Sequence, residues 1–108
     1  MDLRDCFWDQ VYKEMQINKD IFIITVDTDS FGLQLIKKEF PNNVINSGVS
    51  EQNAINLACG LSISGKKVIV FGLIPFLTMR AYEQIKYNMC GSSLNITIAG
   101  LGPGFSFS

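Results

Sequence analysis

The sequence has no histidine among its 108 residues. This absence excludes Ser/His/Asp and Cys/His catalysis by the chain alone and removes the commonest metal ligand. An excess of either charge is also missing, because 9 Lys plus Arg stand against 10 Asp plus Glu. A near-neutral balance gives no electrostatic signal for nucleic acid or for an anionic membrane. We therefore expect neither partner and no histidine-dependent hydrolysis.

Cysteine is scarce and widely spaced. The sequence has three cysteines and no CxxC pair, which fits neither a disulfide framework nor a zinc site. The three are Cys6, Cys59 and Cys90. Cys6 and Cys59 lie in helical patterns, where a free cysteine is usually a small buried hydrophobe. The expected environment is a reducing cytoplasm.

Long apolar runs are missing as well. The longest, Ile21–Val26 and Val68–Phe76, are far too short for a membrane-spanning helix. The charged segment 1–6 does not resemble a signal peptide. The sequence favours a soluble protein.

Two kinds of hydrophobic pattern alternate along the chain. Leu3, Phe7, Val11 and Met15 recur at every fourth position, which predicts an amphipathic helix. The continuous β-branched run 21–26 predicts a buried parallel strand. On the same grounds we expect helices over Leu3–Ile17, Phe31–Phe40, Glu51–Ser64 and Leu77–Asn88. We expect strands over Ile21–Val26, Asn43–Asn46, Lys67–Leu73 and Leu94–Ala99.

This alternation predicts an α/β fold of three layers, α/β/α, with a mainly parallel sheet and right-handed crossovers. Ligands in such folds bind beyond the carboxyl ends of the strands. Those ends carry the segments Asp27–Ser30, Ser47–Glu51, Leu73–Phe76 and Gly100–Gly104. The last is a glycine-rich loop that connects to no further element, so we expect one domain over residues 1–108, and an incomplete one.

Several of these residues have ordinary structural explanations. Ser50 is a common helix N-cap, Glu51 is a common first-turn acid, and Asp29 or Ser30 can cap the helix that begins at 31. Gly60 is expected to allow close helix packing, and Gly65 to close its helix.

The run Asn46–Ala54, followed by a helix, a Gly-Lys-Lys turn, a strand and the segment Pro75–Gln84, resembles the pyrimidine-binding domain of transketolase-like thiamine diphosphate enzymes. That family includes transketolase, deoxyxylulose phosphate synthase and the β subunit of 2-oxoacid dehydrogenase E1 components. The resemblance covers nearly the whole chain in order. It implies the thiamine diphosphate-binding fold and a transferase acting on a phosphorylated sugar or a 2-oxoacid.

The family's G-x-x-E segment matches Gly48 to Glu51. In the family this acid hydrogen-bonds N1′ of the aminopyrimidine, which allows the cofactor to act as its own base. The resemblance therefore implies a catalytic and cofactor-binding role for Glu51. Burial would raise the pKa of such a carboxyl and a helix amino terminus would oppose this, and the sequence leaves the balance open.

Other family positions match residues expected to bind the cofactor. Phe76 matches an aromatic that stacks near the aminopyrimidine, and Asp27 matches an acid close to the thiazolium, with Asp29 as its neighbouring alternative. Tyr82 and Met79 lie on the same predicted helix side as further pocket residues, although core packing explains them too and Met79 departs from the family's aromatic.

The family's G-D-G segment, which holds Mg²⁺ and the cofactor diphosphate, has no counterpart in this sequence. The resemblance therefore implies a partner, a diphosphate-binding domain or subunit, in a dimer or larger homo- or hetero-oligomer. We expect the chain alone to be inactive. Whether it is a fragment or a natural split subunit stays open.

Two other functions compete with this hypothesis. One is a non-catalytic, truncated α/β module used for subunit association. The other is a nucleotide-binding α/β domain of different descent, which would need a glycine-rich phosphate loop where Val26–Ser30 is acidic.

Overall fold

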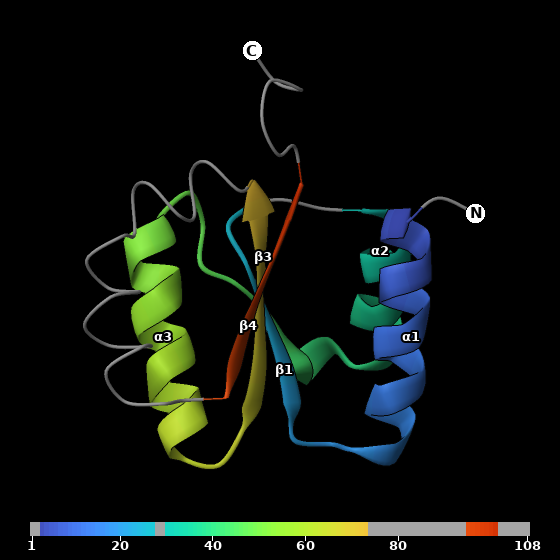
Figure 1. The fold of residues 1–108 in the computed structure, drawn as a ribbon, viewed down its shortest axis with the longest axis horizontal. Helices are drawn as coiled ribbons and strands as arrows, with labels where there is room; N and C mark the ends of the chain where they lie inside the picture. The colour runs from blue at the N-terminus through green and yellow to red at the C-terminus, as the bar shows by residue number, and fades with distance from the viewer. Residues whose placement is uncertain (1–2, 28–29, 74–94, 102–108) are drawn as a thin grey trace.

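Three layers form the domain, with α3 on one face of a sheet and α1 and α2 on the other (Figure 1). The computed structural model describes residues 3–27, 30–73 and 95–101. The helices are α1 (Leu3–Ile17), α2 (Phe31–Glu39) and α3 (Glu51–Ile63), with a short 3-10 turn, η1 (Pro41–Asn43). The strands are β1 (Ile21–Thr25), β2 (Val44–Asn46), β3 (Lys67–Leu73) and β4 (Ile96–Leu101).

The sheet is parallel throughout its four described strands, in the order β2-β1-β3-β4. Thr25 of β1 pairs with Asn46 of β2 on one side and with Phe71 of β3 on the other. The carboxyl ends of β1 and β2 therefore lie side by side. The predicted three-layer α/β architecture with a parallel sheet is confirmed, while the helix predicted over 77–88 lies outside the described residues.

The two central strands, β1 and β3, are buried on both faces, as their continuous apolar runs predict. Ile23 packs with α1 and α2, while its neighbour Ile24 packs with α3, because successive side chains point to opposite faces of a strand. In α3 the apolar residues Ile55, Ala58 and Cys59 are buried, and Leu61 is partly buried against the same cluster. Burial of Cys59 raises the pKa of its thiol above the ordinary value.

The buried face of α1 is centred on a residue that the four-residue spacing did not indicate. Trp8 is 1% exposed, and its indole packs edge-on against Phe71 of β3 with ring centroids 4.9 Å apart. Val11 and Met15 are buried as expected, whereas Phe7 is only partly covered. The predicted helix is confirmed, and its core stripe is wider than predicted.

The predictions of close packing at Gly60 and of burial at Cys6 were wrong. Gly60 is exposed, and a Cβ built there meets nothing within 4 Å among the described parts of the chain, so none of the described elements packs closely against it. The close approach occurs instead at Gly32 of α2, where a Cβ would lie 2.5 Å from Cβ of Trp8. Cys6 is exposed rather than buried, because it lies on the face of α1 opposite the buried residues Trp8, Val11 and Met15.

The ends of the elements differ from prediction mainly at β4. We expected this strand to stop at Ala99, but it continues through Gly100 and Leu101 because β3 extends far enough to pair with both. Ser30 caps α2 by accepting a hydrogen bond from the Leu33 amide at 3.4 Å. Gly65, at φ 96°, closes α3 in the left-handed conformation that glycine adopts without strain.

Candidate functional site

The carboxyl ends of β1 and β2 are joined by one amide side chain. The Oδ1 atom of Asn46 accepts hydrogen bonds from the backbone amides of Asp27 and Gly48, both at 2.9 Å. Its Nδ2 atom donates to Oδ1 of Asp27 at 3.3 Å. We call these three hydrogen bonds the strand-end clasp. They connect Asp27, two residues after the end of β1, to the turn after β2.

Ser47 makes a second connection between the same strands. Its amide and its hydroxyl both donate to the carbonyl oxygen of Thr25, at 2.9 and 3.2 Å. The Thr25 side chain is fully buried, and its hydroxyl has no hydrogen-bond partner among the described residues. The turn therefore starts from a position fixed against the last residue of β1.

The turn delivers the chain directly to the first residue of α3, Glu51. The Ser50 amide donates to the Gly48 carbonyl at 2.8 Å, and the Ser50 carbonyl accepts from the Ala54 amide at 3.0 Å. The expected side-chain cap is absent, because the Ser50 hydroxyl makes no capping hydrogen bond. Among the described residues, the position of Glu51 is thus set by the backbone of this turn.

Two residues of the clasp have left-handed backbone conformations. Asp27 has φ 62°, which is uncommon for a residue other than glycine, although aspartate tolerates it better than most. Gly48 has φ 77°, and a Cβ built there meets nothing within 4 Å in the described part of the structure. Because the space beside Gly48 is open, a ligand can approach the backbone closely at this end of the sheet.

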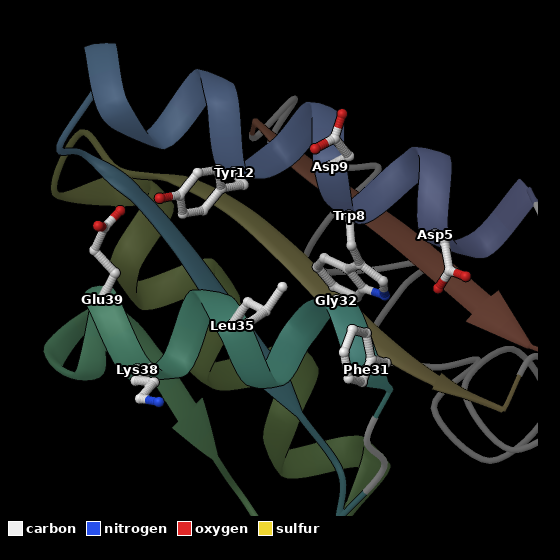
Figure 2. A pocket seen from close by; sticks show the side chains of 9 residues that line it. All are labelled: Asp5, Trp8, Asp9, Tyr12, Phe31, Gly32, Leu35, Lys38 and Glu39. Atoms are coloured by element: carbon white, nitrogen blue, oxygen red, sulfur yellow. The ribbon is translucent and has the colours of Figure 1, made fainter. Parts of the chain in front are cut away.

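A concave surface lies between α1 and α2, on the face of the sheet opposite α3 (Figure 1 and Figure 2). This α1–α2 groove has a volume of about 850 Å³. Trp8 and Gly32 meet between the two helices, Phe31 and Leu35 lie on the α2 side, and Phe31 is 72% exposed. The remaining lining residues are Asp5, Asp9, Tyr12, Lys38 and Glu39.

Hydrogen bonding in the groove differs between Glu39, at one end, and the indole nitrogen of Trp8. Glu39 accepts hydrogen bonds from Tyr12 and Gln16. The bond from Tyr12 is the main cause that lowers the pKa of the Glu39 carboxyl, and it also raises the pKa of the Tyr12 hydroxyl. By contrast, the buried Nε1 of Trp8 has no hydrogen-bond partner among the described residues.

Comparison with known proteins identifies the family. Residues 1–106 match the family model described as the transketolase pyrimidine-binding domain. The chain belongs to this family. The observed fold agrees with this family. The order of helices and strands predicted a parallel α/β sheet, and the resemblance implied the fold of the pyrimidine-binding domain.

The relatives of this pyrimidine-binding domain are transketolase subunits and deoxyxylulose phosphate synthases. The chain is 34% identical over 105 residues to an apulose-4-phosphate transketolase subunit of Phocaeicola vulgatus, covering 96% of this chain and 34% of the relative. It is 34% identical over 98 residues to the 1-deoxy-D-xylulose-5-phosphate synthase of Halothermothrix orenii, covering 85% of this chain and 15% of the relative.

A solved structure agrees with these relatives. A protein described as "Split gene transketolase, inactive beta4 tetramer" superposes with a TM-score of 0.80 at 30% identity. The match covers 90% of this chain and 33% of that one. The pyrimidine-binding domain described here thus spans about a third of the solved chain, and 34% and 15% of the two curated relatives named above.

Of the residues predicted to bind the cofactor, the structure places two at the same end of the sheet. Asp27 follows β1, and Glu51 begins α3 after the turn held by Ser47. The other three lie outside the described residues, as does Asp29. They are Phe76, Met79 and Tyr82. The roles of all five stay predictions.

Asn46 was not among the residues predicted to form the site. It lies in the segment that carries the family resemblance, directly after a predicted strand, and an amide side chain that both donates and accepts is suited to joining two backbone ends. Its position in that segment and its amide side chain are the features from which its role could have been predicted. The α1–α2 groove had no comparable signal, because it depends on which helices lie side by side.

Proposed function

We propose that the chain is the pyrimidine-binding component of a thiamine diphosphate-dependent, transketolase-like enzyme, assembled with a separate diphosphate-binding domain or subunit. The observation that carries the proposal is the convergence of Asp27 and the first residue of α3, Glu51, at the carboxyl end of a parallel sheet. Relatives described as transketolase subunits support it. In folds of this class, ligands bind at that end.

The residues at this end suit an aminopyrimidine-containing cofactor. Asp27 carries a carboxylate, Gly48 has open space beside it among the described residues, and Glu51 begins a helix whose position the turn fixes. When bound, thiamine diphosphate supplies the carbon nucleophile for transfer of a ketol or acyl unit. In this proposal Glu51 shares a proton with N1′ of the aminopyrimidine, and Asp27 lies near the thiazolium.

Three further residues complete the proposed pocket. Phe76 stacks on the aminopyrimidine ring, and Met79 and Tyr82 line its side. Mg²⁺ and the diphosphate are held by the partner, since no counterpart of the family's G-D-G segment occurs in this sequence. Among the described residues, no group of three or more His, Cys, Asp or Glu is arranged to hold a metal ion.

The relatives support a proposal for the assembly. The solved relative is described as an inactive β4 tetramer of a split-gene transketolase. We propose by analogy that this chain also forms oligomers, that it does not turn over substrate without its partner, and that the substrate is a phosphorylated sugar or a 2-oxoacid. Its proposed location is the cytoplasm. None of the described helices is long and apolar enough to cross a membrane.

The deciding experiment replaces Glu51 with glutamine in the assembled enzyme. Proton transfer by a positioned side chain contributes about 10²- to 10⁴-fold to a rate. Glu51→Gln is therefore expected to slow deuterium exchange at C2 of bound thiamine diphosphate by a factor in that range. Exposed Asn53, in the same helical turn, provides the control variant Asn53→Ala, which is expected to leave exchange unchanged.

Unchanged exchange in Glu51→Gln would contradict the catalytic role. If the unaltered chain also failed to bind thiamine diphosphate in every assembly with a diphosphate-domain partner, it would be a non-catalytic module for subunit association.

A further inference from the structure

The strand-end clasp joins the two segments that carry the proposed cofactor residues. Asp27 follows β1, and Gly48 lies in the turn that leads from β2 to Glu51. The Asn46 side chain bonds to both segments, through the two amides at 2.9 Å and the Asp27 carboxylate at 3.3 Å. A change in the Asn46 side chain therefore acts on both segments at once.

The direction of the three hydrogen bonds requires an asparagine. Two backbone amides converge on one side-chain atom, so that atom must be the acceptor oxygen, and the other end of the amide then donates to a carboxylate. Aspartate at position 46 would keep the acceptor but lose the donor. It would also place a second carboxyl group beside Asp27.

The backbone held by Asn46 is not one that the chain adopts freely. A non-glycine residue at φ 62° is disfavoured, and such conformations persist when surrounding contacts fix them. At Asp27 the fixing contacts come from the clasp. Its side chain and that of Asn46 are both exposed, so water competes for each bond, and the three bonds act together rather than singly.

We infer that Asn46 is a positioning residue for the cofactor site: it holds Asp27 and the turn before Glu51 in one fixed arrangement. This inference rests on the proposed function, and it predicts that Asn46 acts through those two residues without touching the cofactor. Small displacements of positioned groups are costly, since a misplacement of about 1 Å can lower a rate by about 10²-fold.

The structure offers a matched control at the opposite end of the same strands. The side chain of Asn43 donates to the carbonyl oxygens of Lys19 at 3.1 Å and of Ile21 at 2.9 Å, at the amino end of β1. Asn43→Ala therefore removes hydrogen bonds between the same two parts of the chain, but far along the strands from Asp27. A merely structural role predicts that Asn43 and Asn46 variants behave alike.

Two variants of Asn46 test the inference in the assembled enzyme. Asn46→Ala removes all three bonds and is expected to lower kcat by roughly tenfold to a hundredfold. The KM for thiamine diphosphate should rise at the same time, while Asn43→Ala changes neither. Asn46→Ser, which is smaller but retains one acceptor and one donor, is expected to lie between Ala and the parent, and it replaces Asn46→Ala if that variant does not fold.

A pH profile gives a readout that a structural role would not move. In Asn46→Asp the new carboxyl group faces Asp27, and a like charge nearby raises the pKa of one of the pair. Below that raised pKa the protonated group donates a hydrogen bond again. The activity of Asn46→Asp, relative to the parent, is therefore expected to recover as the pH falls, whereas that of Asn46→Ala is not.

Amide hydrogen exchange on the chain alone supplies a readout independent of the cofactor. The amides of Asp27 and Gly48 should exchange roughly tenfold faster in Asn46→Ala, which corresponds to a tenfold change in an opening equilibrium. They should be unaffected in Asn43→Ala.

The outcomes separate the two hypotheses. If Glu51→Gln slows C2 exchange but Asn46→Ala and Asn43→Ala have equal effects on kcat and KM, the proposed function stands and the positioning role is overturned. If Asp27 and Gly48 keep their protection in Asn46→Ala, the clasp itself is overturned. If Glu51→Gln has no effect on C2 exchange, the proposed function and the role of Asn46 within it fail together.

Discussion

At the carboxyl ends of β1 and β2, one asparagine holds the backbone with three hydrogen bonds, whereas between α1 and α2 an indole packs against a glycine. The first region is exposed and polar, and its contacts fix direction. The second is buried at its base and aromatic, and its contacts fill volume. We therefore expect substitutions in the α1–α2 groove to change mainly stability, and substitutions in the strand-end clasp to change mainly the proposed chemistry.

The largest effect on stability is expected at the contact between the two helices. A Cβ at position 32 would lie 2.5 Å from Cβ of Trp8, an atom attached directly to the backbone, so one helix must shift. Overpacking of this kind costs typically about 1–3 kcal/mol. Gly32→Ala is expected to lower the free energy of unfolding by that amount, measured by urea denaturation with far-UV circular dichroism.

The matched control is the exposed glycine of the other helical layer. Gly60 has open space around it among the described residues, so Gly60→Ala should raise the free energy of unfolding by about 0.5–1 kcal/mol through its better helix propensity. If Gly32→Ala were as stable as the parent, the helices could separate without cost and the groove would not be a fixed feature.

A smaller effect, of opposite sign, is expected beneath the clasp. The hydroxyl of Thr25 is buried without a partner among the described residues, and burying such a group costs about 1–3 kcal/mol in protein mutation data. Thr25→Val has nearly the same shape and removes that cost. We expect it to raise the free energy of unfolding by about 1 kcal/mol, at the low end of this range.

Thr97→Val on β4 serves as the control, because Thr97 is exposed and a surface substitution usually stays within about 0.5 kcal/mol. A loss of stability in Thr25→Val would mean that the hydroxyl does have a partner. The end of β1 would then be held by a buried hydrogen bond of the Thr25 hydroxyl as well as by the clasp.

The smallest effect is expected on the pH dependence of stability, through the hydrogen bond from Tyr12 to Glu39 at the end of the groove. Because the hydrogen bond from Tyr12 lowers the pKa of Glu39 in the folded chain, Glu39 contributes stability above its ordinary pKa of 4.5. That contribution is lost as the pH falls through the lower folded-state value. Tyr12→Phe should therefore make the midpoint of thermal unfolding less sensitive to acid.

Glu39→Gln is expected to remove the same part of the acid sensitivity, and the double variant should add little to either single change. A pH profile of Tyr12→Phe identical to that of the parent would show that the contact carries no stability. In that case the groove would depend on packing alone.

The fold was predictable because its two central strands, β1 and β3, are buried on both faces. A strand that needs cover on both sides reads as a continuous β-branched run, as in 21–25 and 67–73, and parallel strands require helical crossovers between them. The position of the site follows from the same argument, because the carboxyl ends of parallel strands meet at one edge. The sequence alone therefore places Asp27 and Glu51 at the same end of the sheet.

The contacts that hold the site were not predictable in the same way. Asn46 and Asp27 are 19 residues apart, and their pairing depends on the register of β1 against β2. Likewise, the meeting of Trp8 with Gly32 depends on how two helices lie across one face of the sheet. Periodicity reports which face of an element is covered, but not which residue of a neighbour covers it.

Trp8 is the only tryptophan in the chain, and its indole lies edge-on to Phe7 and Phe71 in the layer formed by α1 and α2. Its intrinsic fluorescence is therefore a built-in optical probe of one side of the sheet. Emission from Trp8 would follow the release of α1 from β3, whereas far-UV circular dichroism would follow all helices, including α3. If the two signals changed together, both layers would unfold as one cooperative unit, and if emission changed first, the α1–α2 layer would open before the rest.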